Sequence, residues 1–166
     1  MATTYTLISS VTVGAGGAAT IDFNSIPSTY TDLLLVHSTR AALAGQYGIN
    51  ISFNGSSSGF TGRYLQGNGS AASSGTSTQF IGISPGTGYT ANTFGNGYVY
   101  IPNYAGSTNK SFSTDDVIEN NTTTTYADLV AGLWSNTAAI TSISITPATT
   151  SFLQYSTAYL YGISNA

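Results

Sequence analysis

Charged residues are scarce in this chain of 166 residues: three are Lys or Arg, six are Asp or Glu, and together they make up 5% of the sequence. An average soluble domain carries about 25%. Cysteine is absent and histidine occurs once. Thiols, imidazoles and carboxylates supply most nucleophiles, general bases and metal ligands. We therefore expect no catalytic, cofactor-binding or metal-binding residues, and we expect that the chain is not an enzyme.

Further absences exclude other classes of protein. The formal net charge is −3 and no basic patch is present, so nucleic acid is not an expected partner. The longest apolar run, residues 33–36, is far shorter than the roughly 18 residues of a membrane span, so no membrane association is expected. No repeat of fixed period occurs, which disfavours a solenoid, a propeller or a fibrous shaft.

The chain is instead rich in Thr, Ser, Gly and Tyr, with 19 glycines and 12 tyrosines. Thr and Tyr favour strands, whereas Gly, Asn and Ser favour turns. The length suits a single domain over residues 1–166, large enough for its own core. Composition therefore favours one all-β domain with many turns.

Apolar and polar side chains alternate along most of the chain, which is the pattern of half-buried strands. In residues 46–53, Tyr47, Ile49, Ile51 and Phe53 share one face. The expected strands are residues 5–13, 19–23, 33–40, 46–53, 64–65, 80–83, 97–102, 110–113, 127–134, 141–145 and 155–163. Nine to eleven such strands predict a single-domain antiparallel β-sandwich, with a jelly roll as the preferred topology.

Three segments are predicted to be loops or a helix rather than strands. Residues 54–62 and 67–77 are rich in Gly, Ser and Asn and are expected to be long turns or loops. Residues 114–120 are the one helical candidate.

In the expected strand 5–13, we expect the side chains of Tyr5, Leu7, Val11 and Val13 to lie on the same face.

The acidic residues Asp115, Asp116 and Glu119 form the only acidic cluster. Their oxygens suit a hard cation such as Ca²⁺, but their spacing does not match a calcium-binding loop. The alternative is a solvated loop or the first turn of a short helix, where carboxylates interact well with the helix dipole. We favour the second interpretation.

The lone imidazole, His37, is expected on the strand face of Leu33, Leu35 and Thr39. Catalysis would need a nucleophile and an orienting acid nearby, and no motif supplies them. We therefore expect a structural, hydrogen-bonded histidine.

Two other features are interpreted structurally. Residues 14–17 are glycine-rich but lack the Lys-Ser/Thr ending of a phosphate loop, so a tight hairpin turn is expected. Trp134 follows apolar neighbours, which favours a core or interface anchor over a sugar-stacking platform.

Four segments resemble a known group of proteins: residues 26–33, residues 98–107 with 110–112, residues 132–134 leading to 139–143, and residues 156–163. Together they are similar to small virion proteins of tailed bacteriophages, over most of the chain from about Tyr5 to Ile163. The resemblance implies a jelly-roll-like β domain in a virus particle. It implies no catalytic residues.

Three functions are then open. The first is a capsid decoration (cement) protein at the virion surface, a homotrimer that binds the major capsid protein. The second is a tail-fibre or tail-spike domain that recognises host polysaccharide, for which the tyrosines and the loops between residues 54 and 77 argue. The third, least favoured, is a cell-wall hydrolase, which would need two carboxylates at a cleft. Its candidates are Asp22, Asp32, Asp115, Asp116, Glu119 and Asp128.

Overall fold

The computed structural model describes residues 4–121 and 125–164, and this part of the chain contains strands and no helix. The strands are β1 (Tyr5–Thr12), β2 (Ile21–Phe23), β3 (Asp32–Thr39), β4 (Gln46–Phe53), β5 (Phe60–Gly67), β6 (Ala72–Ser77), β7 (Phe80–Pro85), β8 (Gly95–Ile101), β9 (Lys110–Ile118), β10 (Tyr126–Trp134), β11 (Ile143–Pro147) and β12 (Thr157–Ile163). No helix in the described part could span a membrane.

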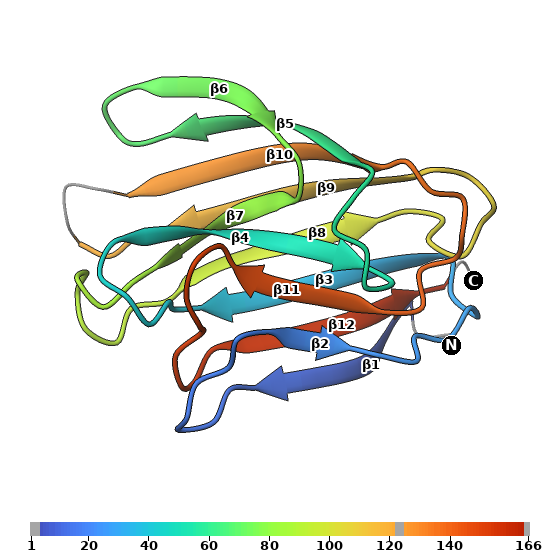
Figure 1. Cartoon of the computed structure of the whole chain (residues 1–166), viewed down its shortest axis with the longest axis horizontal. Coiled ribbons are helices and arrows are strands. Elements are labelled where there is room, and N and C mark those ends of the chain that lie inside the picture. Colours follow the sequence, from blue (N-terminus) through green and yellow to red (C-terminus); the bar gives the residue numbers. More distant parts are fainter. Residues whose placement is uncertain (1–3, 122–124, 165–166) are drawn as a thin grey trace.

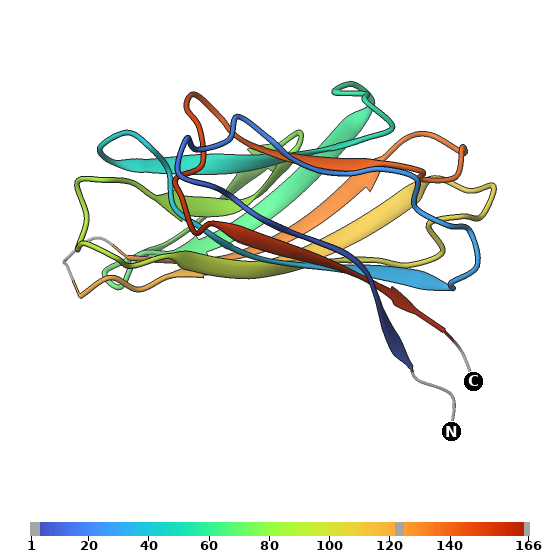
Figure 2. The same cartoon turned by 90° about the horizontal axis from the view of Figure 1, so that it is seen from below.

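The strands form two antiparallel sheets that pack face to face (Figures 1 and 2). The large sheet has eight strands in the order β1-β12-β3-β8-β9-β10-β5-β6, and the small sheet has four in the order β2-β11-β4-β7. The predicted all-β, antiparallel β-sandwich is therefore confirmed.

The pairing is nested, because strands from the two halves of the chain lie beside each other. β1 pairs with β12, β2 with β11, β3 with β8, and β4 with β7. The other four strands follow β4 (β5 and β6) or β8 (β9 and β10), and they extend only the large sheet. The expected jelly-roll topology stays a prediction.

The alternating side chains meet between the sheets. Ile49, Ile51 and Phe53 of β4 are fully buried, as the sequence predicts. Trp134 is buried as well, with its ring centroid 5.5 Å from that of Phe53 and 6.0 Å from that of Phe60. Its Nε1 donates a hydrogen bond to the carbonyl oxygen of Ser58. The prediction of Trp134 as a core anchor is confirmed.

The helix expected at residues 114–120 is not formed. Residues 110–118 are instead the strand β9, which pairs along its whole length with β10 and also with β8. Asp115 and Asp116 therefore point to opposite faces of a sheet rather than lying in a helical turn. Tertiary pairing overrides the local preference of acidic residues for a helix start.

The loops expected at residues 54–62 and 67–77 are partly wrong. β5 begins at Phe60, and β6 occupies residues 72–77 at the edge of the large sheet. The sequence of β6, Ala-Ser-Ser-Gly-Thr-Ser, has no apolar alternation, because both of its faces are largely exposed. Its backbone hydrogen bonds to β5 alone define it as a strand.

Two expectations near the N-terminus also need correction. The pairing of β1 with β12 shifts between Leu7 and Ser9, so the side chains on either side of this bulge change face. Tyr5 and Leu7 are consequently exposed, at 56% and 51%. Residues 14–17 do form a tight turn, with Gly17 N donating to Gly14 O at 3.0 Å. It is not a hairpin turn, because β1 and β2 belong to different sheets.

Candidate functional site

The face of the large sheet that points away from the small sheet is open to solvent, and we call it the outer face. Two rows of directly paired residues cross it. The first is Leu65, Leu129, Asp115, Tyr98, Val36 and Tyr159. The second is Arg63, Ala131, Ser113, Tyr100, Leu34, Tyr161 and Leu7. Apolar and tyrosine side chains therefore make up most of both rows, with Asp115 in the first and Arg63 and Ser113 in the second.

Large apolar side chains gather on this face. Eight are exposed in the described part of the chain, and Leu43 and Tyr155 alone among them lie in loops. The six on the outer face are Tyr5, Leu7, Leu65, Tyr98, Leu129 and Tyr159. A contiguous apolar surface of this kind is a mark of a protein contact site.

Few charges interrupt the outer face. Asp32, at its end, accepts hydrogen bonds from Tyr100 Oη at 2.8 Å and from the backbone N–H of Asn103 at 2.9 Å. Arg63 donates to the carbonyl oxygen of Gly62 at 2.9 Å. Within residues 4–121 and 125–164, neither Arg63 nor Asp115 forms an ion pair.

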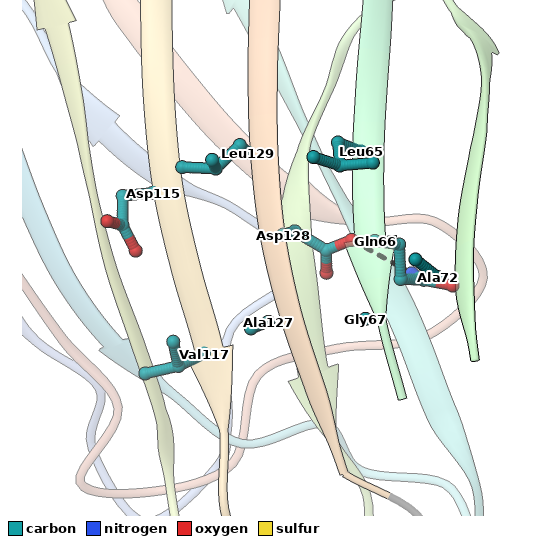
Figure 3. Close-up of a pocket in the computed structure, with 9 residues that line it drawn as sticks. All are labelled: Leu65, Gln66, Gly67, Ala72, Asp115, Val117, Ala127, Asp128 and Leu129. Atoms are coloured by element: carbon teal, nitrogen blue, oxygen red, sulfur yellow. Dashed lines mark hydrogen bonds between the residues drawn. The ribbon is translucent and has the colours of Figure 1, made fainter. Parts of the chain in front are cut away.

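A shallow hollow lies on the outer face where β9, β10 and β5 run side by side (Figure 3). The side chains of Leu65, Val117, Ala127 and Leu129 line it, and Asp115 stands beside them. Such an apolar hollow next to one carboxylate can take a partner's apolar side chain together with a cation.

The inner face of the same sheet carries a buried polar row. His37 (β3), Gly97 (β8), Asp116 (β9), Asp128 (β10) and Gln66 (β5) are paired one after the other across five strands. His37, Asp116 and Asp128 are each only 1% exposed. This end of the core is therefore polar, whereas the other end holds the aromatic cluster around Trp134.

Specific contacts hold the two carboxyl groups in place. Asp116 Oδ1 accepts a hydrogen bond from the backbone N–H of Ile83 in β7 at 2.7 Å, which ties the two sheets together. Asp128 Oδ1 accepts one from Gln66 Nε2 at 2.9 Å. His37 Nε2 lies 3.6 Å from Asp116 Oδ2.

Burial sets the protonation of this row. It lowers the pKa of His37 to about 4, because a charged imidazolium would lose its hydration. Burial raises the pKa of Asp116 to about 8. The hydrogen bond from the Ile83 N–H lowers this pKa, whereas the neighbouring Asp128 and Asp115 raise it further. Burial also raises the pKa of Asp128, opposed by Gln66.

The acidic cluster expected from the sequence does not converge. Asp115 lies on the outer face, Asp116 lies in the core, and Glu119 follows the end of β9 at the surface. No group of three or more His, Asp or Glu side chains in residues 4–121 and 125–164 could hold a metal ion. The interpretation as a helix turn or solvated loop is wrong for Asp115 and Asp116, which are strand residues.

His37 lies on the predicted face with Leu33, Leu35 and Thr39, all four buried. The expected hydrogen bond is not found: neither ring nitrogen has a hydrogen-bond partner among the described residues. Its polar neighbour is instead Asp116, which the sequence alone did not associate with it.

Two buried cations were missed by sequence reasoning. Lys110 is fully buried, and its Nζ donates to the carbonyl oxygens of Gly106 at 2.6 Å and of Thr108. The Arg40 guanidinium donates to the carbonyl oxygens of Tyr89, Thr90 and Thr93. With Asp116 and Asp128, four of the nine charged side chains are therefore buried. A carbonyl-binding cation leaves no signature in a single sequence.

A second concave surface lies beside the β5–β6 hairpin. It is lined by Gly48, Tyr64, Gln66, Ser77, Phe80 and Ile83. The Tyr64 and Phe80 rings meet edge to face with centroids 5.7 Å apart. Ser77 Oγ is buried and has no hydrogen-bond partner among the described residues. Aromatic rings with a few polar groups between them are the usual lining of a small-ligand site.

Comparison with protein-family models, with curated proteins and with solved structures finds no match to this chain. The outer face, the concave surface at Tyr64 and Phe80, and the buried polar row are therefore the features from which a function can be inferred.

Proposed function

We propose that this chain is a structural protein of a tailed-bacteriophage virion, and that it decorates the capsid by binding the major capsid protein on the outer shell. The observation that carries the proposal is the outer face, which is broad, apolar and almost free of charge. Contacts built without charges are insensitive to ionic strength, which suits a particle that must survive outside a cell. The sequence resemblance to virion proteins supports the same setting.

Nucleic acid and membrane are not partners in this proposal. Arg40 and Lys110 are buried and already bound to backbone carbonyls, so Arg63 is the one side-chain cation of the described residues left to meet phosphate. Affinity for nucleic acid rises with the number of phosphates neutralised, and one arginine contributes little.

The proposal includes a jelly-roll topology, the preferred one from the sequence. The nested pairing of β1 with β12, β2 with β11, β3 with β8 and β4 with β7 supports it, because a jelly roll pairs eight strands in two sheets in this way. The hairpins β5–β6 and β9–β10 are then additions to one sheet.

No catalytic step is part of the proposal. Asp116 and Asp128 lie side by side on neighbouring strands, but both are buried, and Asp116 accepts a hydrogen bond from Ile83. The two carboxyl groups of a glycosidase instead flank an open cleft. A turnover assay on cell-wall polysaccharide, with Asp115→Ala and Asp116→Ala variants, tests this. Hydrolysis that either substitution abolishes would contradict the proposal.

Immunogold electron microscopy of purified particles tests the location. Label spread over the head is the expected result. Heads stripped of this chain should then rupture at a lower temperature than intact heads, and equal rupture temperatures would contradict a cement role. Absence of the chain from disrupted particles by immunoblot would overturn the virion assignment altogether.

A tail-fibre domain that binds host polysaccharide is the second candidate, favoured by the groove at Tyr64 and Phe80. Label confined to the tail would replace the first candidate by this one. Binding on a glycan array that Tyr64→Ala abolishes would support it, with Tyr155→Ala, an exposed loop residue, as the matched control.

A further inference from the structure

The part of the outer face centred on β10 is large enough for a specific contact. The five strands from β8 to β6, spaced about 4.8 Å apart and each contributing about seven residues of about 3.3 Å, cover roughly 550 Å². Two copies would then bury about 1,100 Å² in total, just above the roughly 1,000 Å² that a specific interface needs.

The two unpaired charges on the face stand in different rows and on different strands. Arg63 is on β5 beside Ala131, and Asp115 is on β9 beside Leu129, with β10 between them. Two strand spacings and one step of two residues separate their Cα atoms by about 12 Å, and the two side chains form no ion pair with each other. Asp32, at the end of the face, is held by Tyr100 and by the backbone of Asn103. Arg63 and Asp115, one cation and one anion, make the part of the face around β10 complementary to itself.

We propose that a second copy of this chain covers the part of the outer face from β8 to β6 across a two-fold axis, so that Arg63 of each copy pairs with Asp115 of the other. In a two-fold contact, residue i meets residue j and residue j meets residue i, so that Arg63 and Asp115 form the same pair twice. The inference rests on the proposed function for its setting, a protein that acts in several copies. The contact leaves β3, β12 and β1 of the outer face, with exposed Tyr5, Leu7 and Tyr159, to the capsid protein.

The position of the axis follows from the two charges. It lies in the interface, perpendicular to the line from Arg63 to Asp115, and it crosses β10 between Leu129 and Ala131. Each of these side chains then lies near its own counterpart. The centre of the contact is apolar and the two ion pairs flank it, which is the usual anatomy of a homodimer interface. The sequence predicts a homotrimer; the charges on this face fit a dimer.

Sedimentation equilibrium of the full-length chain is the first measurement. We expect a mass of about 34 kDa, twice the 17.1 kDa of one chain. Arg63→Asp and Asp115→Arg should each raise the dimer dissociation constant about 100-fold, because each reversal replaces two attractive pairs by two repulsive ones. Both residues are at the surface, and circular dichroism checks that the variants fold.

Restoring the dimer by complementary charge reversals provides the decisive result. An equimolar mixture of the Arg63→Asp and Asp115→Arg chains should form heterodimers, since each anion then meets a cation. The double variant carrying both reversals should dimerise with itself. Leu129→Asp should dissociate the dimer, whereas Leu43→Asp, an equally apolar exposed residue in a loop, should not. A monomeric or trimeric wild type, or single reversals without effect, would overturn the inference, as would a mixture that fails to pair.

These results are separable from the test of function. A dimer in solution from a chain absent from virions keeps this inference and overturns the proposed function. A chain that is present on capsids but sediments as a monomer keeps the proposed function and overturns this inference.

Discussion

His37 Nε2 lies 3.6 Å from Asp116 Oδ2, although β8 separates the strands that carry these two residues. Gly97 of β8 occupies the position between them in the same row. Because glycine has no side chain, the imidazole and the carboxyl group can approach each other above its backbone. At neutral pH Asp116 is therefore mainly protonated and His37 is neutral, since the pKa of Asp116 is about 8 and that of His37 is about 4.

The first prediction concerns how the free energy of unfolding depends on pH. Folding raises the pKa of Asp116 from 3.8 to about 8, so between these values the folded protein keeps a proton that the unfolded chain has lost. The free energy of unfolding should therefore fall by about 1.4 kcal/mol per pH unit relative to Asp116→Asn, from about pH 4 to about pH 8. Urea denaturation of both proteins across this range measures the difference.

His37 acts in the opposite direction over part of this range. Its pKa falls from 6.5 to about 4 on folding, so the unfolded chain binds the extra proton between these values and stability rises with pH. In the wild type the two effects oppose each other up to about pH 6.5, and the loss due to Asp116 becomes visible above it. A pH-independent difference between wild type and Asp116→Asn would contradict the assignment.

The second prediction concerns the gap that Gly97 provides. A Cβ atom there would lie 2.5 Å from Asp116 Oδ2 and 2.8 Å from the carbonyl oxygen of Asp115. Gly97→Ala should therefore destabilise the fold by about 3 kcal/mol, as overpacking against backbone does. Gly14→Ala is the matched control, because nothing lies within 4 Å of its Cβ position. Chemical denaturation compares the two, and equal stabilities would disprove the close approach.

The third prediction concerns the aromatic cluster at the apolar end of the core. Trp134→Ala should lower the free energy of unfolding by about 4 kcal/mol, because it leaves a cavity beside Phe53 and Phe60 and frees the Ser58 carbonyl. Tyr155→Ala, at a residue 67% exposed, should change it by less than about 0.5 kcal/mol. Thermal unfolding of both variants is sufficient to test this contrast.

The fourth prediction concerns the segment between β7 and β8. Arg40 holds the carbonyl oxygens of Tyr89, Thr90 and Thr93. Arg40→Met should leave these oxygens without their charged donor and destabilise the segment by about 2 kcal/mol. Amide hydrogen exchange at Thr93 should accelerate, whereas Arg63→Met should leave it unchanged. Unchanged exchange in Arg40→Met would show that the segment orders itself.

Strands with apolar alternation could be predicted from the sequence. The segment 46–53 shows the reason: Ile49, Ile51 and Phe53 are buried on one side, and each strand face keeps one kind of side chain. β6 could not be predicted in this way, since neither of its faces packs on the core. The bulge in β1 was equally invisible, because it depends on the register with β12.

The buried polar row lay beyond prediction for a different reason. His37, Asp116 and Gln66 are distant in sequence, and only the order β3-β8-β9-β10-β5 brings them into one line. A single sequence contains neither that order nor the role of Gly97. Trp134 is predictable as a core anchor because its sequence neighbours are apolar. The sequence gives no reason to expect that Asp116 is buried while the adjacent Asp115 lies on the outer face.

The β5–β6 hairpin has a consequence for engineering. Its outer strand pairs on one side only, and the turn between the strands, residues 68–71, is exposed throughout. A foreign peptide inserted at this turn would displace no core side chain and would disturb no packing contact between the two sheets. If the chain does coat a capsid, this hairpin becomes a natural place from which to display an epitope in many copies on a particle.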